Sequence, residues 1–417
     1  MKKAIKNSDK EVLGRLFFDD PDSLWVEEFD NNSQALPPYF LSYCKKQYQR
    51  YSKRRYFYIC NADGSIRWIY DETLTSPLFL LFYNAEFFKA KIFKVIFKLL
   101  FLFRLKTIAN HGGFTLHYKS DYPLQKMLDK IPHNQYAIFT GTVGSTRKFV
   151  MATAINKRVN YFIKKAWLPE AIKAVENERK NIDLLQPYLK REMPSSVDLA
   201  ISGSVAVESV KTNHNFGSME FTFRHKEFLN KLYQVDRSNS TYNDWSNDHI
   251  VKRLESLHNA KTVNDISLSK TISESLESLH HQLYNSNFEL QLTWSHQDFT
   301  PWNMYVGDQN LAVYDWELAQ SEMPLFYDVF HFFFQKGILV QRKGYGEIRE
   351  DISKAFNDFE LDIQNGEKLD WKFYLKLYLL LIVPYYLKRY LEQPDLHIQA
   401  HWLIEVWAEA LEDQKKD

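Results

Sequence analysis

The stretch WSHQDFTPWN, residues 294–303, places a histidine, an acid and an amide within eight positions. Residues 288–294, FELQLTW, lead into it and alternate apolar and polar side chains, which predicts a β-strand with one buried face. After Asn303, the runs MYV and LAVYD flank a polar turn, which predicts a β-hairpin. The sequence therefore predicts that Asp298 and Asn303 share one loop, and that the hairpin returns Asp315 beside them.

Two acids and an amide in one cleft suit magnesium-assisted phosphoryl transfer. Mg²⁺ prefers oxygen ligands and keeps several waters, so Asn303 and Asp315 suffice as protein ligands when nucleotide phosphates complete the shell. A separate carboxylate has to orient the acceptor hydroxyl and take its proton, and we assign Asp298 to this role. We interpret His296 as a brace for the loop, and Glu317 of the DWE tripeptide as structural support.

The pattern H-x-D-x-x-x-x-N, followed by Y-D-W-E, resembles the catalytic and metal-binding loops of the aminoglycoside phosphotransferase and choline kinase family. Members of this family are small-molecule kinases with a protein-kinase-like fold. The resemblance covers about residues 130–340. It implies an α+β, bilobal fold with a β-rich small lobe and a mostly helical large lobe, and ATP and Mg²⁺ as cofactors, with ATP versus GTP left open. The motif MPLFYDVFHF extends it and implies that Asp328 anchors the large lobe.

The resemblance requires an upstream lobe that holds the nucleotide, and the sequence contains a suitable glycine turn. In GTVGST, between two expected strands, Gly141 and Gly144 lack a Cβ atom, and Ser145 offers a hydroxyl or a backbone amide to phosphates. The turn departs from the G-x-G-x-x-G pattern, and a hairpin turn with two glycines is common in proteins without nucleotides.

A lysine and a glutamate follow the glycine turn in the order that the resemblance implies. Lys164 in the strand YFIKK resembles the lysine that contacts the nucleotide phosphates, and Lys165 is the alternative because neighbouring strand residues point to opposite faces. Glu178 on the next expected helix resembles the glutamate that holds this lysine. Glu176 is its competitor, about 200° away around the helix.

The first 125 residues lie outside the resemblance. They contain one clear hairpin pattern, RYFYICNADGSIRWIY, in which two aromatic runs flank a polar turn. Residues 84–105 predict an apolar helix punctuated by basic residues. Three interpretations stay open for this helix: packing on its own domain, peripheral contact with a membrane surface, or a surface for a partner protein.

The composition bounds the function class. Lys plus Arg number 53 and Asp plus Glu number 52, so no strong overall field attracts nucleic acid, and we expect no nucleic-acid partner. The two cysteines, Cys44 and Cys60, argue against a disulfide framework and a cysteine-based zinc site. The start of the chain has no uninterrupted apolar stretch, so it does not resemble a secretory signal. We expect a cytoplasmic protein, with peripheral attachment to the inner face of the membrane as an extension.

These observations predict three regions and one leading function. Residues 1–125 form an extension of unknown role, residues 130–212 a nucleotide-binding lobe, and residues 213–417 a helical lobe with the catalytic and metal loops. The leading hypothesis is a kinase that transfers the γ-phosphate to a hydroxyl of a small polar acceptor. A sugar or glycoconjugate is slightly favoured over an amino-alcohol or aminoglycoside, because Trp302, Trp316 and Tyr327 could stack on a sugar face. The alternative is a catalytically silent, kinase-like scaffold at a membrane.

Overall fold

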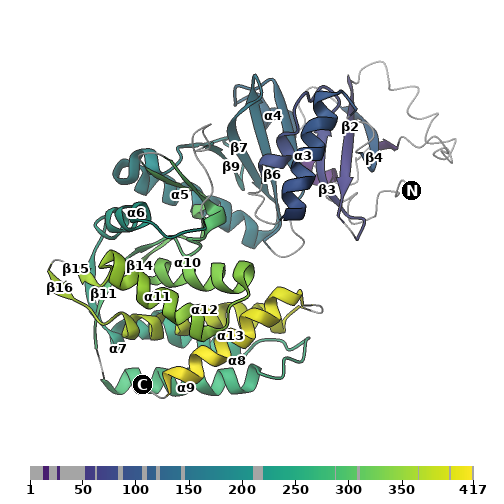
Figure 1. Cartoon of the computed structure of the whole chain (residues 1–417). Helices are drawn as coiled ribbons and strands as arrows, with labels where there is room; N and C mark the ends of the chain where they lie inside the picture. The colour runs from purple at the N-terminus through teal and green to yellow at the C-terminus, as the bar shows by residue number, and fades with distance from the viewer. Residues whose placement is uncertain are drawn as a thin grey trace. The chain divides into compact units, whose positions relative to one another are not determined.

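The chain divides into two units in the computed structural model, which describes residues 13–17, 26–28, 52–61, 63–82, 88–105, 110–118, 123–141, 146–209, 219–286, 288–307, 310–364, 366–393 and 396–415. Unit 1 comprises Met1–Asp183 and Pro194–Lys211, and unit 2 comprises Leu184–Met193 and Thr212–Asp417. Unit 1 is built on strands and unit 2 mainly on helices (Figure 1). The expected α+β class, with a β-rich part before a helical part, is confirmed.

Unit 1 is organised around one nine-stranded sheet in the order β1-β4-β2-β3-β5-β6-β7-β9-β8, and each neighbouring pair is antiparallel. Its strands are β1 (Val26–Glu28), β2 (Ser52–Cys60), β3 (Ile66–Asp71), β4 (Gly112–Tyr118), β5 (Gln135–Phe139), β6 (Lys148–Ile155), β7 (Arg158–Ala166), β8 (Ser196–Val197) and β9 (Ser204–Glu208). Its helical segments are η3 (Leu78–Leu81), α3 (Phe88–Leu102), α4 (Pro123–Leu128) and α5 (Pro169–Leu189), whose last residues belong to unit 2. Strands from the expected extension and from the expected nucleotide lobe thus share one sheet.

The sheet of unit 1 has a hydrophobic core on each face, because successive side chains of a strand point to opposite sides. On β2, Tyr56 and Tyr58 enter one core together with residues of α4, while Ile59 enters the other. The second core is closed by α3, which crosses the sheet in Figure 1 and contributes buried Phe97 and Phe101. Both faces of the strands are therefore covered, which explains their dense aromatic composition.

The predicted hairpin of the N-terminal region is confirmed. Strands β2 and β3 pair with Tyr56 opposite Asp71 and Tyr58 opposite Ile69. The turn between them is closed by the Ser65 amide and hydroxyl, which both donate to Asp63 Oδ1. The expected helix within residues 84–105 is also present, as α3. None of the helices in the described part of the chain combines the length and apolar character needed to cross a membrane.

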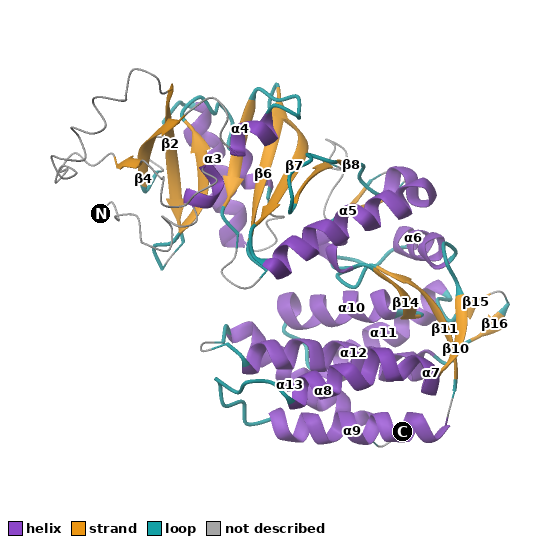
Figure 2. Ribbon diagram, turned by 180° about the vertical axis from the view of Figure 1, so that it is seen from behind, coloured by secondary structure: helices purple, strands orange, loops and turns teal. Residues whose placement is uncertain are grey.

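Unit 2 combines helices with a three-stranded antiparallel sheet of order β10-β11-β14 (Figure 2). Its strands are β10 (Ser238–Thr241), β11 (Glu289–Ser295), β12 (Met304–Val306), β13 (Leu311–Val313), β14 (Gln320–Pro324), β15 (Ile363–Gln364) and β16 (Glu367–Lys368). Its longer helices are α6 (Phe223–Tyr233), α7 (Tyr242–Ser246), α8 (Lys252–His258), α9 (Ser269–Ser286), α10 (Tyr327–Lys336), α11 (Tyr345–Phe359), α12 (Trp371–Leu391) and α13 (Ile398–Gln414). Short helical segments are η4 (Lys190–Glu192), η5 (Asn247–Val251), η6 (Pro301–Asn303), η7 (Trp316–Leu318) and η8 (Gly337–Gln341).

Two elements of unit 2 position the candidate site. Strand β11, predicted from its alternating pattern, runs directly into the loop that carries Asp298. Helix α10 is buried over its whole length, and its first turn carries Asp328. The loop is therefore held between the end of a strand and the start of a buried helix.

Candidate active site

The loop that follows β11 is tied to helix α10 by one carboxylate. Asp328 is completely buried and accepts hydrogen bonds from the Ser295 hydroxyl (2.9 Å), the His296 amide (2.8 Å) and the Gln297 amide (2.9 Å). Loss of this carboxylate would remove the acceptor of the buried Ser295 hydroxyl and His296 amide, at about 1–3 kcal/mol each, while the Gln297 amide would keep its 3.1 Å bond to Ser295 Oγ. This geometry agrees with the anchoring role that the resemblance implied for Asp328.

The environment of Asp328 contains opposing electrostatic effects. Burial raises the pKa of this carboxyl, while His296 and the three hydrogen bonds act in the opposite direction. Gln297, at the turn of the loop, has a left-handed backbone with φ 62°. A non-glycine residue rarely adopts this conformation, and the surrounding contacts have to maintain it. The bonds from the Gln297 amide to Asp328 and from its side chain to Leu318 O (2.8 Å) supply these contacts.

His296 is a buried, neutral brace. Its Nδ1 atom accepts a hydrogen bond from the Asp298 amide (3.3 Å), so the proton resides on Nε2, which donates to the carbonyl of Tyr314 (3.1 Å). Burial lowers the pKa of His296, although the carboxylates of Asp328, Asp298 and Asp315 oppose this shift. The histidine thereby links the loop to the end of the hairpin, and its two ring nitrogens are occupied by backbone groups.

The Asp298 carboxylate faces the amide of Asn303. Asn303 Nδ2 donates to Asp298 Oδ2 (2.7 Å) and to the Asp298 carbonyl (3.1 Å). Because the nitrogen is committed to Asp298, the amide oxygen is the atom that can serve as a metal ligand. The Asp298 side chain keeps 29% of its surface exposed, so its carboxylate stays accessible from solvent.

A histidine that the sequence analysis missed contacts the same carboxylate. His331 Nε2 lies 3.4 Å from Asp298 Oδ1, and His331 Nδ1 lies 3.4 Å from the hydroxyl of Tyr378. The His331 ring is buried and is stacked parallel to Tyr327, with centroids 6.0 Å apart. Its position was available from spacing, because it follows Asp328 by three residues on one helix and so lies on the same face.

The hairpin after Asn303 returns an acid to the loop, as predicted. Strands β12 and β13 pair Met304 with Val313, and the Tyr314 amide donates to the Asn303 carbonyl (3.0 Å). Asp315 is the next residue and has a left-handed backbone, φ 72°. This conformation ends the strand and begins the short helix η7.

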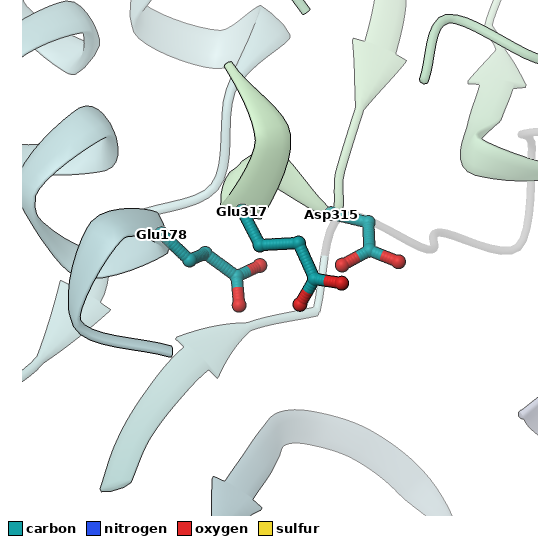
Figure 3. A group of neighbouring side chains, drawn as sticks. All are labelled: Glu178, Asp315 and Glu317. Carbon is teal, nitrogen blue, oxygen red and sulfur yellow. The ribbon is translucent and has the colours of Figure 1, made fainter. Parts of the chain in front are cut away.

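Asp315 and Glu317 form an acidic pair. Each offers a carboxylate oxygen, and these oxygens lie within 4.8 Å of one another. Figure 3 draws the two side chains next to each other. Both residues are half-buried. Two ligands of one Mg²⁺ are at most about 4.2 Å apart, because each metal–oxygen distance is about 2.1 Å. Small side-chain rotations would therefore allow both to bind one ion. The sequence analysis assigned Glu317 only to support, so its proximity to Asp315 is new.

In unit 1, Lys164 and Glu178 form a buried ion pair. Lys164 Nζ lies 2.7 Å from Glu178 Oε1, and the exposed fractions of the two side chains are 10% and 0%. Lys164 is in β7, and Glu178, which Figure 3 also draws, is in α5. The alternatives differ in their surroundings: Lys165 donates to the Ser202 carbonyl (2.6 Å), and Glu176 is exposed. The structure thus pairs Lys164 with Glu178, while their role toward a nucleotide stays a prediction.

Of the predicted glycine turn, Gly141 is described, whereas Gly144 and Ser145 lie outside the described residues. Gly141 has φ +80°, and a Cβ atom there would lie 2.2 Å from the Lys148 carbonyl. Glycine is therefore required at this position by the close approach of two backbone segments. The contact between these two backbone segments explains the glycine by itself, so Gly141 gives no evidence about phosphate binding.

The aromatic residues near the loop differ in their exposure. Trp316 is fully buried and packs against His296, and Tyr327 is buried against His331. Neither ring is available to stack on a sugar, contrary to the expectation from sequence. Trp302 is half-buried and is the remaining candidate of the three.

Comparison with known proteins gave matches among solved structures only. No family model matches the chain, and no curated protein matches it. Choline kinase LicA from Streptococcus pneumoniae is 13% identical, with a TM-score of 0.47 over 69% of this chain and 97% of that chain. A glucosamine kinase complex with glucosamine, ADP and inorganic phosphate is 14% identical, with a TM-score of 0.42 over 67% of this chain and 82% of that chain. A mutant of aminoglycoside phosphotransferase APH(4)-Ia with ADP and hygromycin B is 16% identical, with a TM-score of 0.42 over 66% of this chain and 92% of that chain. At these identities and scores, the function has to be argued from the site itself.

Proposed function

We propose that this protein is a small-molecule kinase that transfers the γ-phosphate of ATP, in the presence of Mg²⁺, to a hydroxyl group of a small polar acceptor. In this proposal residues 130–212 form the nucleotide-binding lobe and residues 213–417 the helical lobe with the catalytic and metal loops. Residues 1–125 form the extension, to which the proposal assigns no role.

The observation that carries the proposal is the arrangement around Asp298. Its carboxylate is exposed enough to meet an acceptor, and it is oriented by Asn303 Nδ2 at 2.7 Å. In our proposal Asp298 accepts the hydrogen bond of the acceptor hydroxyl, aims its oxygen at the phosphorus, and receives the proton as the new O–P bond forms. Fixed positions of this kind supply most of the catalysis in phosphoryl transfer.

The donor set beside Asp298 fits a magnesium ion. The Asn303 amide oxygen and the carboxylates of Asp315 and Glu317 are hard oxygen ligands, which Mg²⁺ prefers. A bound Mg²⁺ would neutralise negative charge on the phosphoryl oxygens. For the nucleotide phosphates, we assign Lys164 as the contact and Glu178 as the residue that fixes its ammonium group, supported by their buried 2.7 Å pair.

The acceptor is the least constrained part of the proposal. A sugar or glycoconjugate hydroxyl remains our first choice, with amino-alcohols and aminoglycosides as competitors. Burial of Trp316 and Tyr327 removes two of the three aromatic rings that favoured a sugar, so Trp302 alone supports this preference.

The decisive experiment measures phosphate transfer with nucleotide and metal fixed and the acceptor varied across sugars, amino-alcohols, polyols and aminoglycosides. We expect turnover with one acceptor class, and Asp298→Asn should lower kcat by about 10²–10⁴, the usual contribution of a positioned base. The same variant should keep its stabilisation by MgATP, since Asp298 is assigned to the acceptor. At a hundredfold excess over Kd this stabilisation is about 2.7 kcal/mol.

A matched pair of variants on helix α5 tests the nucleotide assignment. Glu178→Gln removes the buried partner of Lys164, and we expect a Kd for MgATP at least tenfold higher, which lowers the stabilisation by about 1.4 kcal/mol at the same MgATP concentration. Glu176→Gln changes an exposed glutamate half a turn away and should leave nucleotide binding unchanged. If MgATP neither stabilises the protein nor is consumed with any acceptor, and Asp298→Asn changes nothing, the enzyme proposal fails. The alternative, a silent kinase-like scaffold, would then be favoured.

A further inference from the structure

Helix α3 of unit 1 is apolar on two faces, and the described residues bury only one of them. Phe93, Phe97 and Phe101, spaced four residues apart, lie on the buried side, where Phe97 meets Phe79 of η3 with centroids 5.6 Å apart and Phe93 meets Trp68 of β3 at 6.0 Å. This row satisfies the need of the helix to pack on its own domain. It does not account for the apolar side chains on the other side of the helix.

The opposite face of α3 and the turn after it expose large hydrophobic side chains, each between 43% and 73% accessible: Ile92, Val95, Ile96, Leu99, Leu102 and Phe103. At about 100° per residue they cover an arc of about 120°. Of the sixteen exposed large hydrophobic side chains among the described residues, seven lie within residues 92–105. Single exposed hydrophobic residues need no explanation, but a contiguous patch of this kind marks an interaction surface.

The charge around this face identifies the kind of partner. From Phe87 to Ser120 the sequence contains seven Lys or Arg residues and no Asp or Glu. Around the helix, Lys94 and Lys98 lie between the exposed arc and the buried phenylalanines, and Arg104 is exposed in the turn after the helix. An apolar stripe bordered by basic side chains, on a helix that does not span a membrane, suits the headgroup region of a bilayer. The stems of the lysines can follow the apolar surface while their ammonium groups meet anionic headgroups.

We propose that the exposed face of α3 docks on an anionic lipid bilayer, with the helix axis parallel to the membrane plane. A second copy of the chain fits this face poorly, because it would place two acid-free basic surfaces against each other. An acidic protein groove is the other competitor, and the test below separates it from lipid. The proposal concerns unit 1 and stands or falls independently of the phosphotransferase assignment.

The test is co-sedimentation of the full chain with two kinds of vesicle. One consists of phosphatidylcholine alone, and the other contains about 30% phosphatidylserine, which makes its surface anionic. We expect binding to the anionic vesicles, weakened by 0.5 M NaCl, which shortens the Debye length to roughly 4 Å. The variant Ile96→Ser/Leu99→Ser/Leu102→Ser should bind at least tenfold more weakly. Lys98→Gln/Arg104→Gln should lose affinity for anionic vesicles specifically.

A matched control replaces exposed hydrophobic residues elsewhere, Leu184→Ser/Val263→Ser/Ile398→Ser, and should bind vesicles like the parent chain. Circular dichroism and Tm verify that each variant is folded. Absence of vesicle binding by the parent chain, or equal binding by the α3 triple variant, would overturn the proposal. Concentration-dependent dimerisation that the α3 variant abolishes, without vesicle binding, would assign the face to a second copy instead. Salt-sensitive capture by an acidic protein in the absence of vesicle binding would assign it to a protein partner and equally overturn the lipid docking.

Discussion

Asp298 is held at both carboxylate oxygens, by Asn303 on one side and by buried His331 on the other. His331 is buried and acts through Asp298, so we regard it as a positioning residue. We predict that His331→Leu lowers kcat by about tenfold, which corresponds to about 1.4 kcal/mol of transition-state stabilisation, and leaves the acceptor KM nearly unchanged. His331→Gln, which keeps an N–H donor, should restore part of kcat.

The split between kcat and KM distinguishes positioning from a general loss of stability. His331 contacts the Asp298 carboxylate, so folded His331→Leu should lose kcat while its acceptor KM and its stabilisation by MgATP stay nearly unchanged. Phe334→Leu is the control, because Phe334 is buried on the same helix and packs on Tyr378. It should lower Tm and leave both kcat and the acceptor KM intact. An unchanged kcat in folded His331→Leu would show that Asn303 alone orients the base.

Single residues were predictable where the chemistry demands a particular side chain at a particular spacing. The order of Asp298, Asn303 and Asp315 was visible because their chemistry and the hairpin between them are local in sequence. The spacing of His331 from Asp328 placed it on the same helical face, but its contact with Asp298 joins residues 33 positions apart, and no local pattern indicates that contact. The positive φ of Gln297 is likewise imposed by Asp328 from another element, and no local pattern signals it.

At the scale of elements, helix α6 has a cap that makes its stability depend on pH. The Thr222 amide, at the N-cap, donates to Nδ1 of His225 (3.0 Å), a position where Glu or Gln usually completes the capping box. Burial lowers the pKa of His225 to about 3, with the charge of Lys336 acting in the same direction. Only the neutral imidazole can accept the bond at Nδ1, so protonation would break the cap.

We predict that this histidine contributes to acid unfolding. The unfolded chain binds a proton at His225 below about pH 6.5, whereas the folded state resists it until about pH 3, so the free energy of unfolding falls as the pH drops through this window. Each pH unit below 6.5 costs about 1.4 kcal/mol, or about 2 kcal/mol between pH 6.5 and 5.

Urea unfolding of the parent chain and His225→Gln at both pH values measures this contribution. The glutamine keeps an acceptor for the Thr222 amide and has no titratable group. Between pH 6.5 and 5 the free energy of unfolding of His225→Gln should therefore fall by about 2 kcal/mol less than that of the parent chain. Thr222→Ala is the control, because it keeps the Thr222 backbone amide and the titratable histidine, and should retain the full acid sensitivity. Equal slopes for the parent and His225→Gln would contradict the assignment.

At the scale of the whole molecule, the continuous sheet of unit 1 is the feature that local patterns could not supply. The β2–β3 hairpin was predicted because its turn is short and its strands are adjacent. The pairing of β3 with β5, Tyr70 opposite Ala137, bridges 67 positions and includes α3 and β4 in the connection. Pairings of such long range depend on how the strands fit both cores, and no local period encodes them. The β-rich and helical halves, by contrast, follow from side-chain periodicity within each segment.

The shared sheet predicts that the first 125 residues fold together with the strands of the proposed nucleotide-binding lobe. Tyr56 on β2 and Tyr136 on β5 are buried, and their hydroxyl groups lie 2.8 Å apart, 80 positions apart in sequence. Tyr56→Phe or Tyr136→Phe leaves one buried hydroxyl without this partner, while the double variant removes both, so the two effects should not add. A double-mutant cycle by urea unfolding should give a coupling of about 1 kcal/mol. Additive effects would show instead that residues 1–125 form a domain of their own. So would two separate unfolding transitions, one shifted only by Tyr56→Phe and the other only by Tyr136→Phe. As a control, Tyr56→Phe in unit 1 combined with Phe334→Leu in unit 2 should give additive effects, because the two residues belong to different units.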